Sequence, residues 1–353
     1  MPIPPFRPAW WLPGAHAQTL GARLFRSSRG VTHGRERLEL PDGDFVDLDW
    51  VTVVGGRPAP ADGPLVLVLH GLEGSARSTY ALEAYRALAA HGVSAVGLNF
   101  RSCSGEPNRL PRLYHSGDTG DLAHVVATLR DRRPDHAIGA VGFSLGGNVL
   151  LKFLGERSEA SPLAAAAVIS VPFDLSAGAA HLERGFARVY RHFLVRKLQR
   201  KVAVKRDVLR EHVDVATVLA ARSFHQFDDA ITAPLHGFDG AADYYRRSSS
   251  AGYVDRIRVP TRVIHARDDP FLPAAAIPER ALAANPCLEV TLTDSGGHVG
   301  FVTGSVWAPV FWAEREAARF VAGKLLEGGP VDERASPHTP RRLASHSARC
   351  PGV

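Results

Sequence analysis

Apolar and polar residues alternate along this chain in two kinds of segment. Short, almost uninterrupted apolar runs are typical of strands buried on both faces of a sheet. Such runs occupy residues 65–69, 95–100, 137–141, 165–171, 261–265 and 288–293. Between them, residues 78–91, 119–132, 145–155, 273–284 and 309–326 carry apolar side chains at helical spacing. The pattern therefore predicts strands that alternate with helices.

A hairpin precedes this alternation. Residues 36–40 and 45–54 flank the turn sequence Pro41-Asp42-Gly43-Asp44, and polar and apolar residues alternate in the second segment. Together with the strand–helix alternation, this predicts an α/β fold with a mostly parallel, doubly wound sheet and an antiparallel N-terminal hairpin. The 353 residues suffice for one large core.

The alternation stops over residues 173–258, which we call the lid segment. Its sequence has no clear strand pattern, so we expect a helical insertion above the carboxyl ends of the strands. The α/β core then comprises residues 36–172 and 259–326, and residues 1–35 form an N-terminal arm. Residues 327–353 are rich in Gly, Pro, Ser and Arg, and we expect a disordered tail.

Positive charge gathers in the lid segment. The formal net charge is +6, and residues 184–210 hold ten Arg or Lys against one acid, Asp207. Phe186, Val189 and Phe193 are interleaved with these cations at helical spacing. Two interpretations follow: an amphipathic lid helix with a solvated basic face, or a surface for peripheral contact with anionic lipid or an acidic head group. No nucleic-acid-binding motif accompanies the charge, so we expect no nucleic-acid partner.

Cysteine content and hydropathy bear on the compartment. The three cysteines, Cys103, Cys287 and Cys350, are too few and too scattered for a disulfide framework. No apolar run approaches the ~20 residues of a membrane span, and residues 1–35 do not have the pattern of a signal peptide. We therefore expect a cytoplasmic protein. The sequence predicts no oligomeric state.

A nucleophile is predicted where one strand runs directly into a helix. Residues 142–146 read Gly-Phe-Ser-Leu-Gly, which is G-x-S-x-G between a predicted strand and a predicted helix. The glycines at 142 and 146 leave room for a tight turn that exposes the hydroxyl of Ser144. The same turn directs the amide of Leu145 to where an oxyanion would form.

A base and an orienting acid follow in the chain order Ser, Asp, His. His298 follows a predicted strand and a Gly-Gly turn, and Asp268-Asp269-Pro270 follows another strand. A serine hydroxyl needs a histidine to accept its proton and a carboxylate to orient that histidine. We favour Asp269, directly before the proline, as the acid, and Asp268 stays open as the alternative.

A second oxyanion donor is expected in the loop after the strand at residues 65–69. This loop reads His70-Gly71-Leu72, and the amide of Leu72 is the natural partner for that of Leu145. The His-Gly pair has no further ligand at metal spacing, so the sequence predicts neither a metal nor a cofactor.

Longer stretches of the sequence also match a known family. They are residues 18–20, 38–47, 70–75, 99–108, 114–118, 227–229, 244–245 and 296–301. Over residues 6 to about 325 the chain resembles the YheT-like family of α/β-hydrolases, which includes the mammalian ABHD1/ABHD3-type lipases and bacterial esterases. The resemblance implies an α/β-hydrolase fold and a serine hydrolase of carboxylic esters, with Ser144, Asp269 and His298 at the positions of the family's triad.

The sequence thus predicts a carboxylic ester hydrolase that forms an acyl-enzyme on Ser144. Its partners would be small acyl esters, and the resemblance implies short- to medium-chain esters or acylglycerols. One alternative is acyl transfer to an alcohol, which uses the same triad. A second is a binding protein without catalysis on a hydrolase scaffold, although such proteins usually lack a triad member.

Overall fold

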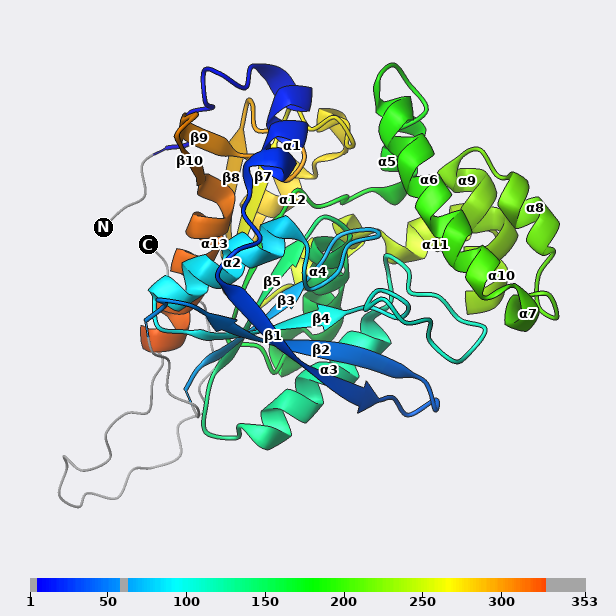
Figure 1. Ribbon diagram of the computed structural model, residues 1–353, viewed down its shortest axis with the longest axis horizontal. Helices are drawn as coiled ribbons and strands as arrows, with labels where there is room; N and C mark the ends of the chain where they lie inside the picture. The colour runs from blue at the N-terminus through cyan, green and yellow to red at the C-terminus, as the bar shows by residue number, and fades with distance from the viewer. Residues whose placement is uncertain (1–4, 58–62, 328–353) are drawn as a thin grey trace.

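The computed structural model describes residues 5–57 and 63–327. Its centre is an eight-stranded sheet with the order β1-β2-β4-β3-β5-β6-β7-β8 (Figure 1). The strands are β1 (Val31–Glu39), β2 (Phe45–Val53), β3 (Leu65–Leu69), β4 (Ser94–Asn99), β5 (Ile138–Phe143), β6 (Ala165–Ile169), β7 (Thr261–Ala266) and β8 (Leu288–Thr293). Strand β2 pairs antiparallel with both β1 and β4, and the other neighbours are parallel. The predicted sheet is therefore confirmed.

The first strand is longer than predicted. It begins at Val31 instead of residue 36, and Val31 pairs with Val53 at the far end of the hairpin. Every residue of β1 is at least partly exposed, because this strand forms the edge of the sheet. An exposed edge strand needs few apolar residues, so its first half has no clear hydrophobic pattern.

Helices cover both faces of the sheet. Helices α2 (Thr79–Ala90) and α13 (Trp312–Glu327) pack on one face, and α3 (Thr119–Arg132) and α4 (Leu145–Arg157) pack on the other. Strand β3 shows the division, because Leu65, Leu67 and Leu69 join one apolar cluster and Val66 and Val68 join the other. This explains why β3 is apolar at every position.

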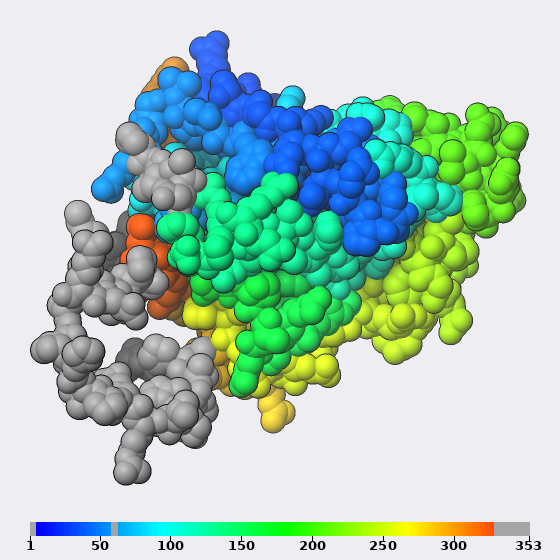
Figure 2. Space-filling view, turned by 90° about the horizontal axis from the view of Figure 1, so that it is seen from below, coloured from blue at the N-terminus to red at the C-terminus, as the bar shows by residue number. Residues whose placement is uncertain are grey.

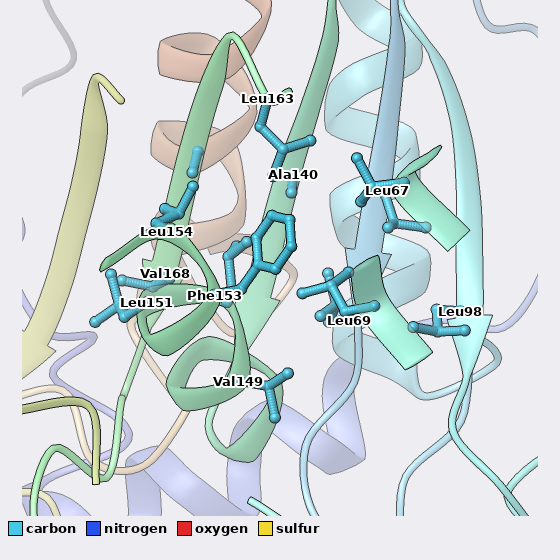
Figure 3. Packing of buried hydrophobic residues seen from close by; sticks show 14 of the residues in the cluster. Leu67, Leu69, Leu98, Ala140, Val149, Leu151, Phe153, Leu154, Leu163 and Val168 are labelled. Carbon is cyan, nitrogen blue, oxygen red and sulfur yellow. The ribbon is translucent and has the colours of Figure 1, made fainter. Parts of the chain in front are cut away.

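The larger cluster joins helix α4 to the central strands. Figure 3 shows Phe153 of α4 between Ala140 of β5 and Leu69 of β3, and all three side chains are buried. This packing fixes α4 against the carboxyl end of β5, where the predicted nucleophile lies.

Two predicted helices differ from the structure. Residues 273–284 form a short 3-10 turn (Ala274–Ala276) and the helix α12 (Glu279–Ala284), because Pro278 interrupts a continuous helix. Residues 309–311 belong to a strand, β10 (Ala308–Phe311), which pairs with β9 (Val302–Ser305). Helix α13 therefore starts at Trp312.

The N-terminal arm contains a helix that the sequence analysis did not predict. Helix α1 (Gly14–Phe25) packs through Ala22 against Val302 and Phe311 of the β9–β10 hairpin. Its Gln18 side chain donates to the carbonyl of Val302 at 3.2 Å and accepts from the amide of Val302 at 2.7 Å. The arm is thus anchored to residues that lie close to His298 in the sequence.

The lid segment is helical. It holds α5 (Leu175–His181), α6 (Ala187–Val204), α7 (Arg206–Leu209), α8 (Val215–Ala220), α9 (Phe224–Phe227), a π-helical turn (Asp228–Thr232), α10 (Ala233–His236) and α11 (Ala241–Ser248). These helices lie at one end of the molecule (Figures 1 and 2). Helices α6 to α10 share an apolar cluster that includes Val202, Leu209 and Phe227, and α5 and α11 share a second one that includes Leu175 and Tyr244. Asn148 of α4 ties the segment to the core, because its side chain donates to the carbonyl of Ser248 and accepts from the amide of Ser250.

Within the described residues, no helix is long and apolar enough to cross a membrane. The predicted tail, apart from Glu327 at the end of α13, lies outside the described residues.

Candidate active site

Ser144 occupies a strained turn between β5 and α4. Its backbone has φ 50° and ψ −118°, in a region that side chains other than glycine rarely adopt. A Cβ atom on Gly146 would lie 2.6 Å from the carbonyl oxygens of Leu69 and His70. A Cβ atom on Gly142 would lie 2.7 Å from the carbonyl oxygen of Gly146. Only glycine fits at both positions, which is the physical reason for the G-x-S-x-G pattern.

Three side chains that the sequence analysis singled out lie in hydrogen-bond contact. The Nε2 atom of His298 is 2.9 Å from Oγ of Ser144, and its Nδ1 atom is 2.8 Å from Oδ2 of Asp269. The Asp269 carboxylate is buried and also accepts from the amide of Phe271 at 2.8 Å. A proton on Nδ1 satisfies the carboxylate and leaves Nε2 free to accept from the serine hydroxyl.

Asp268, the alternative acid, has a different partner. Its Oδ1 atom accepts from the amide of Gly297 at 2.9 Å and so ties the loop after β7 to the loop that carries His298. Burial raises the pKa of its carboxyl group above the ordinary value. The structure therefore brings Asp269, and not Asp268, to the imidazole.

Helix α1 and an aromatic ring hold the histidine loop in place. The ring of Phe271 stacks on the His298 imidazole with centroids 4.1 Å apart and an interplanar angle of 4°. The amide of His298 donates to Oγ1 of Thr19 at 2.9 Å. A Cβ atom on Gly297, whose φ is +63°, would lie 2.4 Å from the carbonyl oxygen of Ala15. Sequence reasoning assigned no role to Thr19, although residues 18–20 are among the family-like stretches.

The two predicted oxyanion donors border the same cavity as Ser144. Leu145 is the first residue of α4, so its amide has no acceptor within the helix. The loop before Leu72 is held by His70, whose Nδ1–H donates to the carbonyl of Gly71 while Nε2 accepts from the amide of Phe100. Burial lowers the pKa of His70 to about 3, so the ring is neutral and keeps this tautomer.

A cavity of about 730 Å³ lies in front of Ser144. Its walls come from α1, the loop after β3, and helices α5 and α6 of the lid segment, and the apolar lining includes Leu175, Leu182, Leu194 and Phe224. A cavity of this size is typical of a site for a small organic molecule.

Charged groups also line this cavity. The Glu73 carboxylate, directly after Leu72, lies 2.7 Å from Nζ of Lys201 on α6 and accepts from the Tyr114 hydroxyl at 2.9 Å. Asp228 is hydrogen-bonded to Tyr245 at 2.8 Å, and its burial raises the pKa to about 6. The sequence analysis assigned a role to neither carboxylate. In residues 5–57 and 63–327, no cluster of three His, Cys, Asp or Glu side chains could hold a metal ion.

Comparisons with known proteins extend this picture. The family model for the alpha/beta hydrolase fold matches residues 64–305. The chain is 42% identical to "Putative esterase YheT" of Escherichia coli (strain K12), over 88% of this chain and 90% of that protein. It is 31% identical to "Phospholipase ABHD3" of Mus musculus, over 92% of this chain and 79% of that protein. It is also 32% identical to "Monoacylglycerol lipase" of Saccharomyces cerevisiae, over 67% of this chain and 55% of that protein.

Proposed function

Because the chain belongs to the YheT/ABHD3-like family of esterase- and lipase-type α/β-hydrolases, we propose that it is a serine hydrolase of carboxylic esters that works through an acyl-enzyme. The observation that carries the proposal is the chain of two hydrogen bonds from Ser144 through His298 to Asp269. This arrangement can activate a serine hydroxyl near neutral pH.

The first half of the reaction acylates the enzyme. Oγ of Ser144 attacks the ester carbonyl while Nε2 of His298 takes the hydroxyl proton, and Asp269 stabilises the imidazolium that results. The amides of Leu72 and Leu145 donate to the oxyanion of the tetrahedral intermediate. Collapse of this intermediate breaks the bond to the alcohol, which leaves with the proton from His298.

The second half releases the acid. His298 deprotonates a water molecule, which attacks the acyl carbonyl, and the tetrahedral intermediate collapses back to Ser144 and a carboxylic acid. Before this attack the same acyl-enzyme could react with an alcohol, so the ratio of acid to new ester measures how well the cavity excludes water.

We infer the substrate class from the walls of the cavity. The lid segment contributes mainly apolar side chains, which suit a short- to medium-chain acyl group, and the charged residues near Glu73 suit a polar alcohol portion. Short- to medium-chain acyl esters and acylglycerols have this division. The names of the phospholipase and monoacylglycerol lipase relatives support the same class.

A fluorophosphonate probe and p-nitrophenyl esters test the proposal. The wild type should be labelled and should hydrolyse the esters, whereas Ser144→Ala should lose labelling and on the order of 10⁴-fold or more in turnover. Cys103→Ser is the matched control and should remain labelled, because this buried thiol lies elsewhere in the cavity wall. Absence of labelling in the wild type, or equal labelling of Ser144→Ala, would contradict the proposal.

A further inference from the structure

Two helices that border the cavity expose apolar side chains to solvent. On α1, Leu20 and Leu24 lie one turn apart, and Leu24 is 79% exposed. On α6, Phe186, which directly precedes the helix, Val189 and Phe193 lie on one exposed stripe, and Val189 is 55% exposed. Large apolar side chains at this exposure are costly in water unless a partner covers them.

The two exposed faces adjoin each other. His16 of α1 lies 4.7 Å from the ring of Phe186 and is hydrogen-bonded to the hydroxyl of Tyr190 at 3.0 Å. Further along, the guanidinium of Arg23 lies over the ring of Phe193 at 5.7 Å. We call the combined surface of Leu20, Leu24, Phe186, Val189 and Phe193 the docking face.

The docking face adjoins the cavity. Phe193 belongs both to this face and to the cavity lining, and its neighbours Arg23 and Lys197 also line the cavity.

The same surface is strongly basic. Helix α6 carries six Lys or Arg residues and no Asp or Glu along Ala187–Val204. Arg191 pairs with Glu183, and Lys201 pairs with Glu73. Within the described part of the chain, the other four cations of α6 have no carboxylate within ion-pair distance. These are Arg188, Arg196, Lys197 and Arg200.

We propose that the docking face binds the surface of an anionic lipid bilayer, with its apolar side chains among the acyl chains and the cations of α6 against the head groups. An exposed apolar stripe flanked by cations is the pattern of a helix that lies in a lipid interface. A second copy of this chain is a poorer partner, because a symmetric contact would bring one basic stripe against another. The sequence pattern alone places this contact on the lid segment, and the structure adds the exposed apolar side chains of α1.

Vesicle flotation tests the proposal with the full chain carrying Ser144→Ala, so that the result does not depend on hydrolysis. Vesicles of phosphatidylcholine that contain phosphatidylglycerol should carry the protein, and vesicles of phosphatidylcholine alone should carry much less. Added salt should weaken the binding, because it screens the charges of α6 and of the head groups.

Paired variants distinguish binding through this surface from nonspecific adsorption to the vesicles. Leu24→Ser with Val189→Ser should lower the partition constant for the anionic vesicles by roughly tenfold or more, because two apolar anchors are lost. Trp307→Ser is the matched control, since Trp307 is 92% exposed on the β9–β10 hairpin, and it should leave binding within about twofold.

Charge is tested in the same way. Arg196→Gln with Arg200→Gln should lower binding by roughly tenfold or more, whereas Arg280→Gln with Arg315→Gln, on α12 and α13, should change it by less than about threefold. Unchanged midpoints of urea unfolding would show that every variant is folded.

Three outcomes would overturn the proposal. The chain carrying only Ser144→Ala could fail to float with anionic vesicles, or the control variants could lose as much binding as the paired variants. Sedimentation could also show a dimer that Leu24→Ser with Val189→Ser dissociates, which would make the face an interface between two copies of the chain.

Discussion

At the scale of single residues, the neighbours Asp268 and Asp269 have different structural roles. Asp269 accepts from Nδ1 of His298, and Asp268 accepts from the backbone amide of Gly297. Both lie in the turn between the end of β7 at Ala266 and Pro270. The sequence favours Asp269 and leaves Asp268 open as the alternative, and the geometry brings Asp269 to the imidazole.

Replacement of each aspartate tests this division. Asp269→Asn should lower kcat for p-nitrophenyl esters on the order of 10³- to 10⁴-fold, because the amide favours the wrong histidine tautomer. Asp268→Asn keeps an acceptor for the amide of Gly297 and should cost less than about tenfold. A larger loss for Asp268→Asn than for Asp269→Asn would assign the acid to the other residue.

The carboxyl group of Asp228 should make the free energy of unfolding depend on pH. Burial raises the folded-state pKa of Asp228 to about 6 from its ordinary value of 3.8. The stabilisation that its protonated form contributes is therefore complete below about pH 4 and is lost as the pH rises through 6. Asp228→Asn is uncharged throughout and should gain up to about 3 kcal/mol in unfolding free energy relative to the wild type between pH 4 and 7.

Urea unfolding of both proteins at several pH values measures this difference. If the difference in unfolding free energy between the two proteins stays constant across this pH range, Asp228 does not titrate there.

At the scale of elements, helix α6 is linked to the loop that presents the proposed oxyanion donor. Lys201 pairs with Glu73 at 2.7 Å, and Nζ of Lys197 donates to the carbonyl of Glu73 at 3.3 Å. Glu73 has a φ of 55°, directly after Leu72. The lid segment thus helps to hold a strained residue next to the amide of Leu72.

Lys201 is therefore expected to act as a positioning residue. Lys201→Met should lower kcat by about tenfold with a smaller change in KM, because the position of the Leu72 amide matters most in the transition state. Lys201→Arg keeps the ion pair with Glu73 and should restore most of kcat. Equal losses for both variants, or a change confined to KM, would contradict this role.

The elements also show how far the sequence can be interpreted. The central strands and α2, α3 and α4 were predicted to within a few residues, because burial on both faces leaves an unambiguous apolar pattern. Helix α1 was missed, because much of its length faces solvent or contacts residues distant in sequence, such as Val302. The β9–β10 hairpin was missed because two four-residue strands are too short for a periodic signal.

The predicted site shows the same limit. The order and spacing of Ser144, Asp269 and His298 carried enough information to single out these three side chains, which the structure brings into contact. Their catalytic roles stay a proposal. The supporting contacts of Thr19 and Lys201 could not be predicted, because each depends on how distant segments pack, although Thr19 lies in the family-like stretch 18–20.

At the scale of the whole molecule, an N-terminal helix and a loop near the C-terminal end of the described chain meet beside the candidate active site. Thr19 and His298 are 279 positions apart in the sequence, and the hydroxyl of one accepts from the amide of the other. The N-terminal arm is therefore part of the support for the histidine loop.

Thr19→Val tests this support. Loss of the acceptor leaves the His298 amide unpaired, so the imidazole is held less well. If this raises the activation free energy by about 1 kcal/mol, kcat should fall roughly fivefold. Thr19→Ser retains the hydroxyl and should keep kcat near the wild-type value. Ser27→Ala, an exposed change after the helix, serves as the control. A kcat in Thr19→Val equal to that of the control would show that the arm does not influence the base.

Helix α1 has one further consequence. The residue that supports the imidazole loop, Thr19, is followed about one turn later by Leu24, which is exposed to solvent. A small displacement of this helix would thus be transmitted to the loop of His298, the proposed proton acceptor, through the hydrogen bond from its amide to Thr19 and the close contact of Gly297 with Ala15. The rate of turnover for esters in micelles would then differ from the rate for dispersed esters, and the difference would be larger than the local substrate concentration alone explains.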